Sequence, residues 1–94
     1  MTLFGILRET LIKDGYTISH QMAENLAQAG GDIVTIISGL MIRDWKKNED
    51  VQKRMKNDLE DYLLEESKRW QIYLHFETID TILDEVIRIA KNIY

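Results

Sequence analysis

The stretch LAQAGGDIVTIISGLMIRDWKK, from Leu26 to Lys47, decides the fold. After its two glycines the apolar residues are Ile33, Ile36, Ile37, Leu40 and Met41. This spacing places them on one face of a helix, whereas a β-strand would show strict alternation. Gly30 can end a first helix in the left-handed conformation, and Asp32 can cap a second one. We therefore interpret the stretch as two helices in a tight hairpin, with one continuous helix kinked at the glycines as the alternative.

The first helix of this hairpin is expected over residues 20–29. Three other segments show the same helical spacing of apolar side chains, and they are residues 2–13, 48–66 and 78–94. The chain contains no proline and all five glycines lie before residue 40, so its second half lacks both strong helix breakers. The sequence predicts one all-α domain over residues 1–94, a small up-and-down bundle of four or five helices.

Residues at the borders of these segments predict where the helices begin and end. Gly15 is expected to stop the first helix, and Ser19 to cap the second. A later helix is expected to begin between Asn48 and Asp50. Thr78 is expected to cap the last helix, whose apolar stripe begins at the next residue.

The segment RWQIYLHFE, residues 69–77, has two interpretations. Its large apolar residues occupy every second position from Trp70 to Phe76, which is the periodicity of a strand. A strand needs a partner, and the other candidate segment is around residues 16–18. We therefore expect helix here, with a short strand as the alternative.

The composition narrows the class of protein. The chain has 94 residues, 45% of them apolar and 30% charged, which is typical of a globular domain. It has no cysteine, which excludes disulfides and thiolate metal sites. No apolar run approaches the ~20 residues of a membrane span, and the N-terminal segment lacks the basic region of a signal peptide. We therefore expect a cytoplasmic protein that does not contact a membrane.

Motifs for catalysis and for cofactors are missing from the sequence. The glycine pair lacks the spacing of phosphate-binding loops, and no serine stands in a nucleophile elbow. His20 and His75 do not form a metal-binding pair with each other or with a helical carboxylate. The sequence therefore predicts no metal, no cofactor, no small-molecule substrate and no enzymatic activity.

A basic cluster is the first candidate site. Residues 43–56 hold six lysines and arginines against three acids, in a chain with a net charge of −4. Basic side chains beside an aromatic ring can contact a nucleic-acid backbone and offer a base a stacking surface, although we expect Trp45 to close the core. An ordinary solvated charged surface has the same composition. The candidate nucleic-acid-binding residues are Arg43, Lys46, Lys47, Lys53 and Arg54.

The second candidate site is a set of large apolar side chains in the second half of the chain. A small bundle is not expected to bury all of them, and exposed aromatic residues are typical of association surfaces. We therefore expect a protein partner or self-association. The candidate interface residues are Trp70, Tyr73, Leu74, Phe76 and Tyr94.

Two alternative functions rest on other residues. The spacing of Arg69 and His75 resembles the Arg–His motif of HEPN-type ribonucleases, which are all-helical and cleave RNA without metal, but Trp70 replaces the polar residue that commonly follows the arginine. His75 would then act as acid or base. The second alternative is an inhibitor that mimics nucleic acid with clustered carboxylates. Those carboxylates are Asp58, Glu60, Asp61, Glu65 and Glu66.

These observations together favour a non-enzymatic interaction subunit of a larger assembly, in which the basic cluster contacts nucleic-acid backbone without reading its sequence. A short, helical, non-catalytic chain is similar in format to the small subunits of CRISPR surveillance complexes. No motif supports this similarity, so it adds no site residue.

Overall fold

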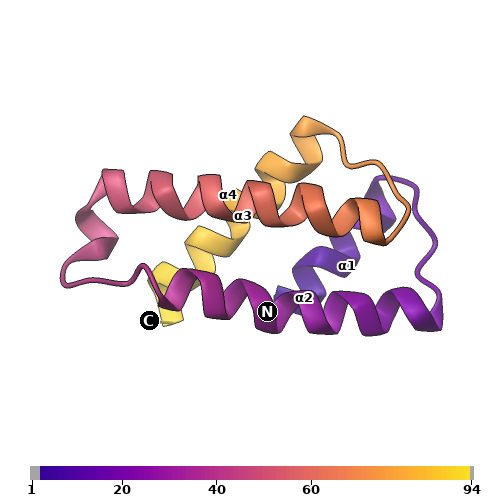
Figure 1. The fold of residues 1–94 in the computed structure, drawn as a ribbon, viewed down its shortest axis with the longest axis horizontal. Coiled ribbons are helices and arrows are strands. Elements are labelled where there is room, and N and C mark those ends of the chain that lie inside the picture. The colour runs from indigo at the N-terminus through magenta and orange to yellow at the C-terminus, as the bar shows by residue number, and fades with distance from the viewer. Residues whose placement is uncertain (1–2, 94) are drawn as a thin grey trace.

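The computed structural model describes residues 3–93, and this part of the chain contains four α-helices, one 3₁₀ turn and no strand (Figure 1). The helices are α1 (Leu3–Lys13), α2 (His20–Ser38), α3 (Glu49–Arg69) and α4 (Phe76–Ile93), and the 3₁₀ turn η1 spans Trp45–Lys47. The prediction of a small all-α bundle is confirmed.

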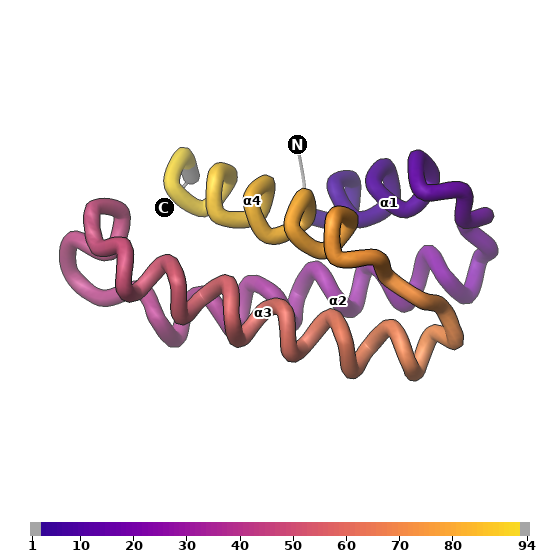
Figure 2. Tube along the Cα trace, turned by 90° about the horizontal axis from the view of Figure 1, so that it is seen from above, coloured from indigo at the N-terminus to yellow at the C-terminus, as the bar shows by residue number. Residues whose placement is uncertain are grey.

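The four helices form two layers. Figure 2 shows α2 and α3 side by side in one layer, with α1 and α4 lying across them in the other. Each helix packs against its neighbour in sequence, and α1 also packs against α4, which closes the bundle. The molecule measures 39 × 22 × 20 Å, and its helix connections lie at the two ends of the long axis (Figure 1).

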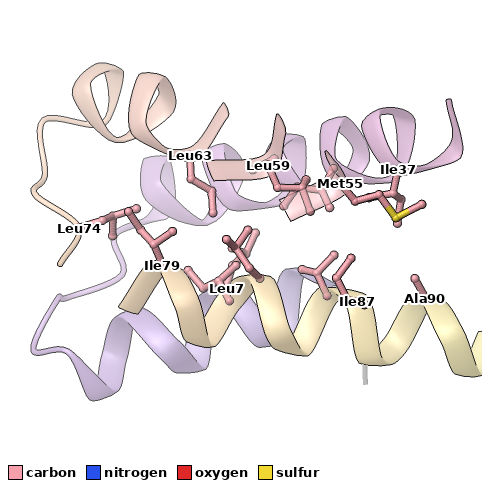
Figure 3. Packing of buried hydrophobic residues seen from close by; sticks show 14 of the residues in the cluster. Leu7, Ile37, Met55, Leu59, Leu63, Leu74, Ile79, Ile87 and Ala90 are labelled. Atoms are coloured by element: carbon pink, nitrogen blue, oxygen red, sulfur yellow. The ribbon is translucent and has the colours of Figure 1, made fainter. Parts of the chain in front are cut away.

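The core lies between the two layers (Figure 3). Met55, Leu59 and Leu63 follow one another at four-residue spacing on α3, and all three are fully buried. They pack in one cluster with apolar side chains from the other three helices. Burying each such side chain contributes about 1.5–3 kcal/mol, so the apolar stripes read from the sequence are what hold the layers together.

The hairpin prediction for the glycine pair is wrong, because α2 continues through both glycines to Ser38. Gly30 is buried against α1, where a Cβ atom would lie 3.7 Å from the backbone nitrogen of Phe4. Asp32 does not cap a helix, since its carboxylate accepts hydrogen bonds from Tyr62 and Gln28. Gly30 therefore lies inside a helix that packs on α1, and the alternative of one continuous helix through the glycines is confirmed. This helix ends at Ser38, so the prediction that Leu40 and Met41 are helical is wrong.

Three of the predicted helix ends are confirmed. Ser19 caps α2, its hydroxyl oxygen accepting a hydrogen bond from the Met22 amide at 3.1 Å. Asn48 caps α3 by accepting hydrogen bonds from the amides of residues 50 and 51. Gly15 follows α1 with a φ of 95°, a conformation that other residues rarely adopt.

The helix prediction for residues 69–77 is wrong for residues 70–75, and the strand alternative is wrong as well. Helix α3 ends at Arg69, and α4 begins at Phe76 after a connection of residues 70–75. Gln71 has a φ of 61°, and this left-handed residue turns the chain out of the helix. Thr78 does not cap α4 but lies in its first turn, where its hydroxyl donates a hydrogen bond to Asp14 Oδ2 at 2.9 Å.

Candidate interaction site

The connections α1–α2 and α3–α4 meet at one end of the molecule (Figure 1). The Tyr16 hydroxyl donates a hydrogen bond to the carbonyl oxygen of Tyr73, and Thr78 donates one to Asp14. These two hydrogen bonds join residues 57 and 64 positions apart in the sequence. The first holds the two connections against each other, and the second ties the first turn of α4 to the α1–α2 connection.

Exposed apolar side chains concentrate on the segments at this end. Within residues 3–92, four large hydrophobic side chains are exposed, and three of them are here: Ile12, Tyr73 and Phe76. Tyr73 and Phe76 are 66% and 68% exposed, more than any other large apolar side chain of residues 3–92. We call these three residues the apolar end. Ile12 was missed by the sequence analysis because it lies in the apolar stretch of the first helix beside the buried Leu11.

The other predicted interface residues are placed differently. Leu74 is only 4% exposed and points into the core at the same end as Ile79 (Figure 3). Trp70 is half-buried against the core. Tyr94 lies outside the described residues. The alternation from Trp70 to Phe76 thus does not divide the segment into one buried and one exposed face, and only Tyr73 and Phe76 remain as exposed interface candidates.

The five predicted nucleic-acid-binding residues all lie near the opposite end, where α2 connects to α3. Arg43, Lys46 and Lys47 belong to the connection, while Lys53 and Arg54 lie in the first turns of α3. All five are exposed, and none forms an ion pair with another residue of the range 3–93. We call these five residues the basic end. Lys56 does not belong to it, because its ammonium group pairs with Asp84 on α4 at 3.0 Å.

The backbone of the basic end is held by two side chains. Trp45 is only 6% exposed and packs into the core, as the sequence analysis expected. Gln52 Nε2 donates hydrogen bonds to the carbonyl oxygens of Trp45 and Lys46, at 3.1 and 2.8 Å, which fixes η1 against α3. Because the Trp45 ring is buried, this end offers charge but no tryptophan surface for a base.

The two residues of the ribonuclease alternative lie on different elements. Arg69 is the last residue of α3, and its guanidinium group pairs with Glu66. His75 lies in the following connection, and its ring makes an edge contact with the Tyr73 ring at a centroid distance of 5.0 Å. Arg69 thus contacts Glu66 and His75 contacts Tyr73, so each side chain has a contact within the protein that involves no RNA.

The acids of the mimic alternative all lie on α3. Asp58, Asp61 and Glu65 are exposed at the i, i+3 and i+7 positions of one stripe. Glu60 and Glu66 are partly buried, and Glu65 pairs with Lys68 at 3.5 Å. The acidic surface is therefore one narrow helix face.

Two further observations concern residues 3–93 as a whole. No three histidine, aspartate or glutamate side chains there are grouped so that they could hold a metal ion. None of the helices in this range is long and apolar enough to cross a membrane.

Comparisons of the chain with models of protein families, with curated proteins and with solved structures gave no match.

Proposed function

We propose that this chain is a non-enzymatic interaction subunit that docks onto a protein partner through its apolar end. The observation that supports this proposal is the position of the exposed apolar side chains. The bundle buries most of its large apolar side chains, yet three of the four exposed ones in residues 3–92 lie on the segments at one end. Exposed aromatic residues held on an ordered backbone are typical anchors of protein interfaces.

A second part of the proposal concerns the basic end, which contacts the phosphates of a nucleic-acid strand. Five exposed cations without an ion pair in the described chain support it. The two ends lie at opposite ends of a long axis of 39 Å, so one molecule can dock onto a protein and contact a strand at once. Contacts to phosphates position a strand without reading its sequence.

The docking part is tested by purifying tagged chain from its native host. Replacing both Tyr73 and Phe76 with serine is expected to lower the yield of any partner about tenfold or more, because such anchors dominate interface energies. The control is Ile42→Ser, which removes the exposed apolar side chain that lies outside the apolar end and is 57% exposed. If the control lowers the yield as much as the double variant, or if the double variant retains the partner, the apolar end is not the docking surface.

The nucleic-acid part is tested by fluorescence anisotropy with a single-stranded oligonucleotide of mixed sequence over a range of salt concentrations. Replacing Lys46 and Lys47 with alanine is expected to reduce the slope of log Kd against log salt by about 1.4, which is ~0.7 for each lost phosphate contact. Lys68→Ala serves as the control, because Lys68 lies at the far end of α3 and pairs with Glu65. The absence of binding at low salt would refute this part.

A further inference from the structure

A polar pocket of about 90 Å³ lies between α2 and α3, apart from both the apolar end and the basic end. It is lined by Asn25, Gln28, Tyr62, Glu66, Arg69 and Trp70. Two amides, a phenol, a carboxylate, a guanidinium and an indole thus face one small volume. Convergent polar groups fix the orientation of a bound group, and a volume of about 90 Å³ admits a group of only a few heavy atoms rather than a whole small molecule.

One side of this pocket is fixed by a hydrogen-bond network. The Tyr62 hydroxyl donates to Asp32 Oδ2 at 2.7 Å, and Gln28 Nε2 donates to Asp32 Oδ1 at 3.2 Å. Burial, and next the hydrogen bond to Asp32, raise the pKa of Tyr62, so the phenol stays protonated and remains a donor. Both carboxylate oxygens of Asp32 therefore have partners within the protein, and the carbonyl oxygen of the Gln28 side chain is left for a ligand.

The Glu66 carboxylate is the charged group available to a ligand. Its side chain is only 16% exposed, while its partner Arg69 is 77% exposed. Arg69 Nη1 lies 3.0 and 3.2 Å from the two carboxylate oxygens. Ion pairs with a largely exposed partner contribute little net stability, so a cation from solution can replace Arg69 on Glu66.

We propose that this pocket binds the guanidinium group of an arginine, with Glu66 as its carboxylate partner and Trp70 as its stacking surface. Planar guanidinium groups pair with carboxylates through two parallel hydrogen bonds and stack on aromatic rings. The side-chain oxygen of Gln28 supplies a further acceptor, whereas Asn25 Oδ1 already accepts a hydrogen bond from Gln21 Nε2 at 3.2 Å. The charged groups that line the pocket are Glu66 and Arg69, and Asp32 lies behind Tyr62 and Gln28. Once Arg69 leaves Glu66, the remaining charge is negative, which favours a cation over a phosphate or a carboxylate. Arg69 then occupies the ligand's place in the free protein.

The experiment is an NMR titration of the full chain, monitored at its two tryptophan indole signals. N-acetyl-arginine amide is expected to shift the Trp70 signal with saturation, while the signal of the buried Trp45 at the basic end stays unchanged. N-acetyl-citrulline amide has nearly the same shape without the charge and is expected to give no saturable shift. An equal response to both compounds, or no saturable shift with arginine, would overturn the proposal.

A capped Gly-Gly-Arg-Gly-Gly peptide distinguishes the two sources of a guanidinium group. Affinity about tenfold higher than that of the capped amino acid supports an arginine within a partner protein, whereas equal affinities support a small guanidinium compound. Both results agree with the proposal. Because none of the pocket residues belongs to the apolar end or the basic end, failure here is distinguishable from failure of the proposed function.

Three variants test the roles of the charged residues. Glu66→Gln is expected to weaken arginine binding about tenfold or more, because it removes the carboxylate. Glu65→Gln, one residue earlier and outside the pocket, is the matched control and is expected to leave binding unchanged. Arg69→Ala is expected to tighten binding about threefold by removing the competing guanidinium. Weaker binding by Arg69→Ala, or equal losses by the two glutamine variants, would contradict the assignment.

Discussion

Replacing Trp45 with alanine is expected to lower the free energy of unfolding by about 3–5 kcal/mol, as for other large aromatic side chains removed from a core. The Trp45 side chain is 6% exposed and belongs to the main apolar cluster, although it lies in a 3₁₀ turn between charged residues. Small domains are stable by about 5–15 kcal/mol, so this loss is a large part of the total. Urea unfolding followed by circular dichroism measures it.

Two other variants separate the effect of the ring from the effect of its surroundings. Trp45→Phe keeps an aromatic ring in the core and is expected to lose less stability than Trp45→Ala. Lys46→Ala changes an exposed neighbour and is expected to stay within about 0.5 kcal/mol of the unchanged protein. If Trp45→Ala were as mild as Lys46→Ala, the ring would lie on the surface, and stacking of a base at the basic end would again be a reasonable hypothesis.

The parts of the fold that the sequence predicts depend on residues close together in the chain. Met55 and Leu59 share a helix face because of their four-residue spacing, and both are buried. Leu63, which the same pattern places beside that face, is buried as well. Ser19 caps α2 through a hydrogen bond to an amide three residues later. Local geometry decides each of these features, so periodicity and capping preferences are sufficient to find them.

The features that the sequence misses depend on contacts between distant residues. Threonine is a common N-cap residue, yet the Thr78 hydroxyl donates a hydrogen bond to Asp14, which lies 64 positions away. Residues 70–75 show strand periodicity, but they do not pair with residues 16–18 as a strand would. The contact between the two segments is a hydrogen bond from the Tyr16 hydroxyl to the carbonyl oxygen of Tyr73. The pocket between α2 and α3 forms only when Gln28 and Glu66 are brought together by the packing of their helices. No local pattern specifies that packing.

The glycine pair gives the sharpest test of the fold, because its two members are expected to respond with opposite signs. Gly31→Leu is expected to raise the free energy of unfolding by about 0.5–1 kcal/mol, since glycine is a poor helix former and a Cβ atom at residue 31 meets nothing within 4 Å. Gly30→Leu is expected to lower it by about 1–3 kcal/mol, because the larger side chain pushes α1 away from α2.

Thermal unfolding measures both changes, at about 4–8 °C for each kcal/mol in a domain of this size. Gly30→Ala is the intermediate case, because its Cβ atom would lie 3.7 Å from the Phe4 nitrogen and 3.8 Å from Leu3 Cβ, which are ordinary contacts. We expect alanine to be tolerated at residue 30 and leucine not to be. In a hairpin that turns at Gly30 in the left-handed conformation, any side chain there would be strained, alanine included. Destabilisation by Gly30→Ala as large as that by Gly30→Leu would therefore support the hairpin over the continuous helix.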